Sequence, residues 1–237
     1  MTKKKIITVF VAIGVVVAII AAVLCAIFLP PPSPRKIYRE NLHSIVELKS
    51  SSESIGESFG TAEFIDGEGR LVTNAHVVTY TRLNVTYTFD EYAIRFADEE
   101  EYRAVQLIKY DVGLDVAVLQ LTDETCEFQA IKMGDSTSLH SGDTVYAIGN
   151  AVNYGLSMSQ GIVGIPLLRI EYSGSVRDVI QCDLTIAEGT SGGALLDERG
   201  RLVGITTFRT KDNYGNVVYG IAYCIPIRIV TEFVYGN

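Results

Sequence analysis

The sequence predicts an all-β protein, and three observations support this prediction. Short runs rich in β-branched and aromatic residues recur along the chain, among them NVTYTF, TVYAIGN and VIQCDLTI. Segments of turn-forming composition separate such runs: DGEGR (66–70), DERGR (197–201) and KDNYG (211–215). After residue 37, only YRENLHSIVEL and IPIRIVTEFVY (225–235) have a helical character. Many short strands joined by turns over about 200 residues are typical of a β-sandwich or a pair of β-barrels.

The first 29 residues differ from the rest of the chain. Three lysines, residues 3–5, precede an uncharged apolar run from Ile6 to Leu29. A helix over this run would measure about 36 Å, enough for a hydrocarbon core of about 30 Å. A cleaved signal peptide is the alternative, but its apolar region is normally only about 7–15 residues long. Lysines before a span favour a cytoplasmic N-terminus. We therefore expect residues 1–29 to form a cytoplasmic stub and a single transmembrane anchor, with the remaining chain on the extracytoplasmic side.

A proline-rich segment follows the predicted anchor. Pro30, Pro31, Pro32 and Pro34 favour a stiff, extended spacer, which we assign to residues 30–37. The remainder divides near residues 122–140 into two parts of similar size. We expect a first β-barrel over residues 38–130, and a second β-barrel with a closing helix over residues 131–237. Neither part is large enough to form a very stable domain by itself, so the two should pack on each other.

Charge and cysteine content restrict the classes of partner. The formal net charge is −8, and the three lysines are the only charges in residues 1–29, so the remainder is more acidic still. This argues against nucleic acid and against docking on an anionic membrane surface. Cys126, Cys182 and Cys224 form no CxxC motif or histidine-rich cluster, so no metal or other cofactor is predicted. Unpaired buried thiols are the default expectation, and a Cys182–Cys224 disulfide is the alternative.

One glycine-rich segment has the composition of a catalytic turn. In EGTSGGALL, Gly189, Gly192 and Gly193 surround Ser191, and such a turn could present the hydroxyl group and aim backbone N–H groups. An ordinary hairpin turn would have a similar composition. His76 lies where a strand should end, in LVTNAHVV, and Asp115 directly precedes an apolar strand, where burial requires hydrogen-bond donors.

The order His76, Asp115, Ser191 is one in which catalytic triads occur. Ser191 would be the nucleophile, His76 would accept its proton, and Asp115 would hold the imidazole in the required tautomer. The backbone N–H groups of Gly189 and Ser191 would form an oxyanion hole, with Thr190 completing the turn.

Five separated motifs resemble those of the HtrA/Deg family of trypsin-like serine proteases. They are LVTNAHVV, GLDVAVLQL, GDTVYAIGNAVNYGLSMSQGIVG, IQCDLTIAEGTSGGALLDERGRLVGITT and YGIAYCIPI, in register from about residue 42 to 230. The resemblance implies two six-stranded antiparallel β-barrels with the active site between them, and polypeptide substrates. His76 and Asp115 would belong to the first barrel and Ser191 to the second. The chain departs from the family pattern at GTAE (60–63) and at Glu188, and ends at Asn237 without the PDZ domain that many relatives carry.

The resemblance also predicts a substrate pocket. It assigns Thr185 to the base of the pocket, and Ile186 with the strand Ile205, Thr206 and Thr207 to its walls. Such a pocket would favour small or aliphatic side chains, and the strand could pair with extended substrate backbone.

These observations lead to one functional hypothesis and one alternative. The hypothesis is a membrane-anchored, extracytoplasmic serine endopeptidase that acts on unfolded or extended polypeptides. The alternative is a catalytically idle barrel pair that binds peptides as a chaperone or scaffold. An acyl hydrolase of the α/β type is disfavoured because its strand–turn–helix elbow is missing. The sequence leaves the oligomeric state open, a homo-oligomer included.

Overall fold

The computed structural model describes residues 11–20, 30–172, 174–211 and 216–236, in two units, Met1–Pro32 and Ser33–Asn237. In the first unit, residues 11–20 are helical. The predicted anchor, residues 6–29, lies largely outside the described residues. Within the described ranges, no helix is both long and apolar enough to cross a membrane.

The second unit begins with the helix α2 (Pro34–Asn41), so the prediction of an extended spacer through residue 37 is wrong from Pro34 onward. Proline is tolerated at the start of a helix because the N–H group it lacks would have no helical partner there. Ile37 of α2 is buried close to Gly200 of the second barrel, and the Tyr38 hydroxyl donates a hydrogen bond to the Leu156 carbonyl at 2.6 Å.

The first barrel closes in the strand order β1-β2-β3-β8-β7-β6, with all neighbours antiparallel. Its strands are β1 (Ile45–Ser52), β2 (Gly56–Phe64), β3 (Arg70–Thr73), β6 (Glu91–Arg95), β7 (Arg103–Asp111) and β8 (Val116–Leu121). The short helix α3 (Ala75–Val78) and the hairpin of β4 (Thr79–Arg82) and β5 (Val85–Thr88) separate β3 from β6. Leu48, Phe64, Ile94 and Leu119 fill the barrel interior.

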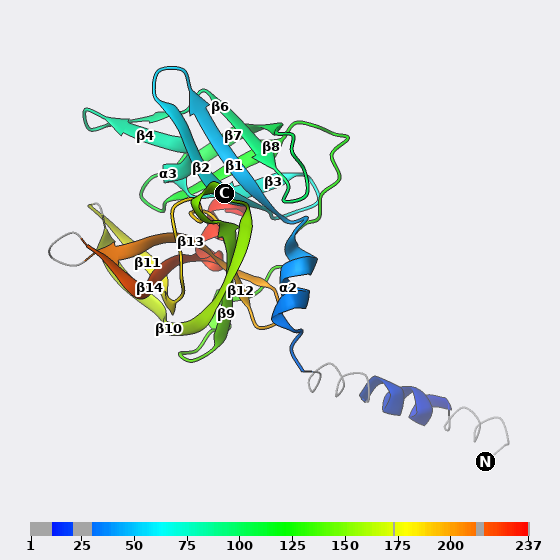
Figure 1. Ribbon diagram of the computed structural model, residues 1–237. Coiled ribbons are helices and arrows are strands. Elements are labelled where there is room, and N and C mark those ends of the chain that lie inside the picture. Colours follow the sequence, from blue (N-terminus) through cyan, green and yellow to red (C-terminus); the bar gives the residue numbers. More distant parts are fainter. Residues whose placement is uncertain (1–10, 21–29, 173, 212–215, 237) are drawn as a thin grey trace, which may run out of the picture. The chain divides into compact units, whose positions relative to one another are not determined.

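The second barrel closes in the order β10-β11-β14-β13-β12-β9. Its strands are β9 (Thr144–Asn150), β10 (Leu156–Tyr172), β11 (Ser175–Asp183), β12 (Ala194–Asp197), β13 (Leu202–Lys211) and β14 (Val217–Pro226). Two 3₁₀ turns, η1 (Ser136–Ser138) and η2 (Ala151–Asn153), flank β9. The helix α4 (Ile227–Tyr235), the red helix in Figure 1, follows β14. The predicted all-β fold of two six-stranded sheets with a short C-terminal helix is confirmed.

A shared hydrophobic cluster joins the two barrels. Ile45 and Val72 of the first barrel, together with Ile148, Leu196 and Ile205 of the second, belong to one buried cluster. Side chains alternate between the two faces of a strand, so the first barrel fills its interior with one set of residues and packs the other set against its neighbour. The two barrels are therefore one packed body, and the boundary between them becomes a place where residues of both can meet.

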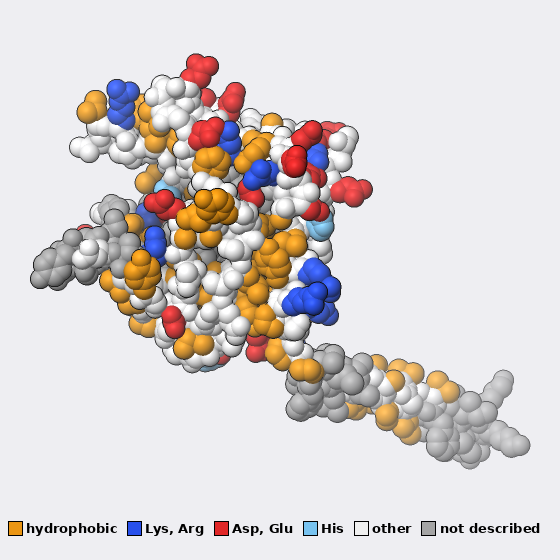
Figure 2. All heavy atoms as spheres, viewed as in Figure 1, with side chains coloured by type: hydrophobic (Ala, Val, Ile, Leu, Met, Phe, Trp, Pro, Cys, Tyr) orange, Lys and Arg blue, Asp and Glu red, His pale blue; other side chains and the backbone are white. Residues whose placement is uncertain are grey.

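The state of three cysteines and the charge of the surface agree with the expectations from the composition. Cys126, Cys182 and Cys224 are all buried and unpaired, as the default expectation stated. On the face shown in Figure 2, acidic side chains are spread over the first barrel, in keeping with the net negative charge.

Candidate active site

His76 is positioned by the single helical turn that follows β3. Ala75, Val77 and Val78 on that turn are buried, which anchors α3 in the first barrel and leaves the imidazole as its exposed side chain. The His76 side chain is 49% exposed. A buried turn with one outward residue thus explains why LVTNAHVV presents a histidine at the barrel edge.

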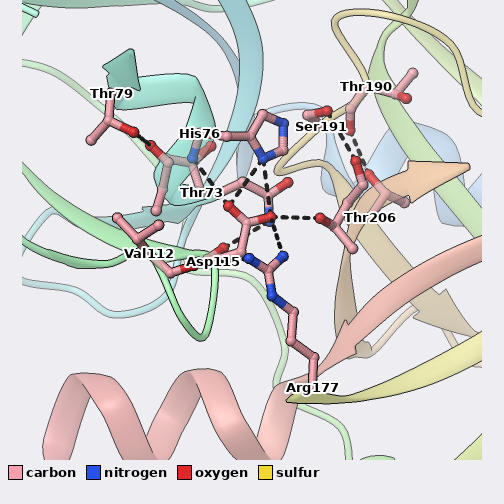
Figure 3. A network of polar contacts seen from close by, with 12 residues as sticks. Thr73, His76, Thr79, Val112, Asp115, Arg177, Thr190, Ser191 and Thr206 are labelled. Carbon is pink, nitrogen blue, oxygen red and sulfur yellow. Dashed lines mark hydrogen bonds and ion pairs between the residues drawn. The ribbon is translucent and has the colours of Figure 1, made fainter. Parts of the chain in front are cut away.

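Asp115 directly precedes β8 and faces His76 (Figure 3). Its φ of 59° is left-handed, a conformation that aspartate adopts more readily than most residues. Nδ1 of His76 lies 3.0 Å from both Asp115 carboxylate oxygens, and the His76 backbone N–H donates to Oδ1 at 3.1 Å. An ionised carboxylate only accepts hydrogen bonds, so Nδ1 carries the proton and Nε2 of the neutral ring is left as an acceptor.

The Asp115 side chain is only 5% exposed, and its carboxyl group is nevertheless ionised. Burial raises its pKa, but the hydrogen bond and charge of His76, followed by the hydrogen bond from Thr207, outweigh this effect. The net result is a pKa below the ordinary aspartate value. The site therefore keeps a negative charge next to the imidazole, where it stabilises the protonated ring that a proton transfer would create.

Thr207 connects Asp115 to Ser191. Its Oγ1 donates to Asp115 Oδ2 at 2.7 Å, and its backbone carbonyl accepts a hydrogen bond from Ser191 Oγ at 3.1 Å. In this structure Ser191 Oγ is therefore hydrogen-bonded to the Thr207 carbonyl and not to His76. Hydrogen bonds of catalytic groups are often long or misaligned without substrate. His76, Asp115 and Ser191 line one cleft of about 550 Å³, so the structure brings the three predicted residues together.

The turn before Ser191 leaves two backbone N–H groups without partners. Gly189 has a φ of 85°, and a side chain there would collide with the carbonyl oxygen of Asn150. The Glu188 carbonyl accepts from the Val152 N–H at 2.7 Å, so the Gly189 N–H, across a trans peptide bond, points to the opposite side. Within the described chain, the Gly189 and Ser191 amides donate to no other group, whereas the Thr190 amide donates to Ala187 at 3.2 Å. Of the three residues assigned to the oxyanion hole, Thr190 thus completes the turn.

Thr61 of β2 supports this turn from the first barrel, a role that the sequence analysis missed. Its Oγ1 donates to the Gly189 carbonyl at 2.8 Å and accepts from the Asn150 N–H at 2.9 Å. Its backbone N–H donates to the Ser191 carbonyl at 2.9 Å. The departure from the family pattern at GTAE (60–63) drew attention to this segment, but nothing in the sequence indicated its distant partners.

The predicted substrate-binding residues are divided between two hollows. Ile186 and Thr207 line the cleft with Ser191, whereas Thr185 and Thr206 line a separate cavity of about 300 Å³. Ile205 is fully buried in the cluster between the barrels. Successive side chains of an extended segment point to opposite sides, so neighbours in sequence cannot all face one pocket.

Residues from both barrels form the remaining walls of the cleft. The β4–β5 hairpin contributes Tyr80, Thr81 and Thr86. The second barrel contributes Tyr172 and Phe208, whose stacked rings have centroids 3.8 Å apart. Val112, Arg177, Ala187, Glu188 and Arg209 also line the cleft. The lining of the cleft therefore combines aromatic, aliphatic and charged side chains.

Two six-stranded β-barrels with a serine, a histidine and an aspartate in one cleft define the class of trypsin-like folds. Residues 60–205, more than half of the chain, match the family described as a trypsin-like peptidase domain. The chain therefore belongs to this family.

Relatives of the chain include serine proteases of the HtrA and Deg type. The chain is 32% identical over 213 residues to a probable periplasmic serine endoprotease, DegP-like, of Bartonella henselae, covering 87% of this chain and 39% of that protein. It is 30% identical over 194 residues to the serine endoprotease DegS of Escherichia coli, covering 81% of this chain and 49% of that protein. The chain thus spans at most about half the length of these relatives.

A solved structure of the HtrA-type protease AlgW with a tripeptide superposes with a TM-score of 0.73 at 28% identity, covering 86% of this chain and 62% of that one. Family membership, the relatives and this structural neighbour together support a serine protease.

Proposed function

We propose that the protein is a serine endopeptidase in which Ser191 attacks the peptide carbonyl carbon, His76 accepts the serine proton, and Asp115 stabilises the resulting imidazolium. The observation that carries the proposal is the pairing of His76 Nδ1 with the buried Asp115 carboxylate at 3.0 Å, in the cleft that Ser191 lines. This pairing leaves Nε2 as the base, and rotation of the Ser191 side chain away from Thr207 would direct its hydroxyl to that atom. The amides of Gly189 and Ser191 would then bind the developing oxyanion.

The test is covalent labelling of the full chain, solubilised in detergent, by a fluorophosphonate probe. We expect the probe on Ser191, detected by mass spectrometry of peptides, and cleavage of β-casein by the same preparation. Ser191→Ala should lose labelling and lose peptidase activity by about 10⁴–10⁶-fold, since triad members act as a unit. Ser141→Ala is the matched control, because Ser141 is exposed and makes none of the hydrogen bonds of the site. A wild-type chain that remains unlabelled while binding unfolded casein would favour the peptide-binding scaffold instead.

We further propose that residues 6–29 anchor the protease in a membrane with the peptidase on the extracytoplasmic side. The uncharged apolar run preceded by three lysines supports this part of the proposal. Intact chain should stay with membranes during carbonate extraction, and protease added from outside should digest the residues after the span. Recovery of a soluble chain that lacks residues 1–29 would identify a cleaved signal peptide and contradict the anchor.

We propose unfolded or extended polypeptides as substrates, cleaved after small or aliphatic residues. Ile186 and Ala187 line the cleft next to Ser191 and offer apolar contacts, while burying one aliphatic side chain supplies only about 1.5–3 kcal/mol, so the preference should be broad. Glu188 lines the same cleft and could attract basic residues. Profiling of cleavage sites in a peptide library distinguishes the two: a dominant Lys or Arg signal at the cleaved position would contradict the apolar assignment.

A further inference from the structure

Arg177 is a largely buried cation that none of the sequence motifs singled out. It belongs to β11 of the second barrel, and its side chain is 9% exposed. Its Nη1 lies 3.5 Å from Oδ2 of Asp115, and its Nη2 donates to the Val112 carbonyl at 2.9 Å. Both acceptors lie in the first barrel, in and next to the loop between β7 and β8 (Figure 3). The β10–β11 hairpin of one barrel is thus tied to the acidic member of the triad in the other.

The charge of Arg177 has a single carboxylate partner. Among the described residues, Asp115 is the only acid within 4 Å of its guanidinium group, and Nε is buried without a hydrogen-bond partner. The guanidinium lies 5.7 Å from the centre of the Tyr172 ring. Taking a cation out of water is costly unless an anion is placed close to it. The electrostatic effect of Arg177 is therefore concentrated on Asp115 and on the imidazole bound to it.

We propose that Arg177 is a positioning residue for the Asp115–His76 pair. This inference rests on the proposed peptidase function. Asp115 receives hydrogen bonds from the His76 ring, the His76 backbone and Thr207, and Arg177 adds an ionic contact on Oδ2. Together these donors hold the carboxylate so that both of its oxygens face Nδ1. Because the guanidinium charge lies beside the carboxylate that holds the ring, a change of charge at residue 177 should alter the pH dependence of the site.

Other charged groups around the site act less directly. Besides the triad residues and Arg177, the charged or titratable side chains that line the cleft are Tyr80, Tyr172, Glu188 and Arg209, and Asp111 ends β7 next to the β7–β8 loop. Neither Glu188 nor Arg209 forms an ion pair within 4 Å of Asp115 or His76 in the described chain. Asp111 accepts the N–H of Leu114 at 2.9 Å. Asp178, next to Arg177 in sequence, pairs with Arg169 instead.

The test is the pH dependence of Ser191 labelling by the fluorophosphonate probe, measured as a second-order rate constant on the full chain in detergent. In Arg177→Gln, the imidazole should keep its second proton to higher pH. The midpoint of the acid limb should therefore move up by about 0.5–1 in pH, a size expected for loss of one nearby charge. The rate near neutral pH should fall about tenfold. Arg177→Lys, which keeps the charge, should leave the midpoint close to that of the wild type.

Arg169→Gln is the matched control, because Arg169 lies on the same hairpin with a side chain 73% exposed and pairs only with Asp178. It should change neither the midpoint nor the rate. Chemical rescue provides a second readout: Arg177 lines both the cleft and a neighbouring cavity of about 450 Å³, so guanidinium ion should reach the space left in Arg177→Ala. Added guanidinium at a concentration that does not unfold the protein should restore part of the rate.

The outcomes separate this inference from the proposed function. Arg177→Gln with a lower rate at every pH but the wild-type midpoint would show a packing role and overturn the inference. If Arg177→Gln does not fold, two other variants test the inference. Guanidinium ion should restore part of the labelling rate of Arg177→Ala, and the midpoint of the acid limb should rise in Arg177→Met as expected for Arg177→Gln. A midpoint of Arg177→Met equal to that of the wild type would overturn the inference. Failure of the wild type to be labelled at Ser191 would overturn the proposed function, and the inference with it.

Discussion

At the scale of single residues, Thr61 and Glu63 of β2 both lie at the boundary between the two barrels. Thr61 is fully buried and bonds to the backbone of both Gly189 and Asn150, residues of the second barrel. Glu63, two residues along, is also fully buried, but its carboxyl group makes no hydrogen bond in the described chain. Its strand partners Ile45 and Val72 belong to the cluster between the barrels, so Glu63 faces that cluster as well.

Thr61→Val should weaken both activity and stability. The substitution keeps the shape but removes the oxygen that holds the turn before Ser191, leaving a buried N–H and a buried carbonyl without partners. Each such group costs about 1–3 kcal/mol. We expect urea denaturation to show a loss of about 2–6 kcal/mol for the two groups together, and the labelling rate of Ser191 to fall about tenfold. Thr61→Ser, which keeps the hydroxyl, should retain most of both; a rate unchanged in Thr61→Val would remove Thr61 from the support of the turn.

Glu63 should make stability depend on pH. Burial raises its pKa well above the ordinary glutamate value, so the native carboxyl keeps its proton while the unfolded chain releases it above about pH 4.3. Stability is then lost as pH rises from that value until the native carboxyl also ionises, with a slope of up to about 1.4 kcal/mol per pH unit. Glu63→Gln cannot ionise, so its free energy of unfolding should exceed that of the wild type by a margin that grows with pH. Parallel pH profiles in urea denaturation would contradict this.

That His76, Asp115 and Ser191 meet in one cleft was predictable at this scale, because motifs and chain order indicate a candidate triad. Ser191, His76 and Asp115 each lie in a segment whose composition suggests their roles. Arg177 and Thr61 were not predictable in that way, because their partners are far away in the chain: Thr61 and the carbonyl that it binds are 128 residues apart. The roles of Thr185 and Thr206 stay predictions: the family resemblance placed them in the substrate pocket, and in the structure both line the cavity of about 300 Å³ that shares Ala187 with the cleft.

At the scale of elements, the helix α2 is the feature that the sequence analysis placed least well. The proline run favoured an extended segment, yet Pro34 starts the helix because proline needs no N–H partner in the first turn. Most strands were predictable from β-branched residues and flanking turns. The turn DGEGR joins β2 to β3, and DERGR joins β12 to β13, whereas KDNYG lies almost wholly outside the described residues.

Ile37 should be the main contact by which α2 stabilises the protein. Its side chain is 1% exposed and lies in the cluster between the barrels. Ile37→Ala should lower the free energy of unfolding by about 2–4 kcal/mol, the usual cost of truncating a buried isoleucine. Arg39→Ala is the control, because Arg39 is exposed on the same helix and alanine favours helix formation. Equal effects of the two substitutions in urea denaturation would mean that α2 contributes little through packing.

At the scale of the whole molecule, the candidate active site lies where the two barrels meet. His76 and Asp115 belong to the first barrel, and Ser191, Thr207 and Arg177 to the second. The two-barrel arrangement was predictable only from the resemblance of five motifs to a family, since composition alone also allowed a sandwich. The sequence could not indicate which outward-facing residues would join the two barrels, because alternation identifies a strand's two faces but not what covers each.

The barrels should unfold as one cooperative unit. A cluster that includes α2, strands of both barrels and α4 is shared between them, so separating the barrels would expose the same apolar surface that unfolding exposes. Far-UV circular dichroism and the fraction of Ser191 that remains reactive to the fluorophosphonate probe should therefore give coincident transitions in urea. Leu195→Ala, a substitution inside the second barrel, should lower the free energy of unfolding by about 2–5 kcal/mol. Both transitions should therefore move together to lower urea concentration. Loss of labelling well before loss of β-structure would show instead that the barrels separate first, and that the site fails by parting of its two halves.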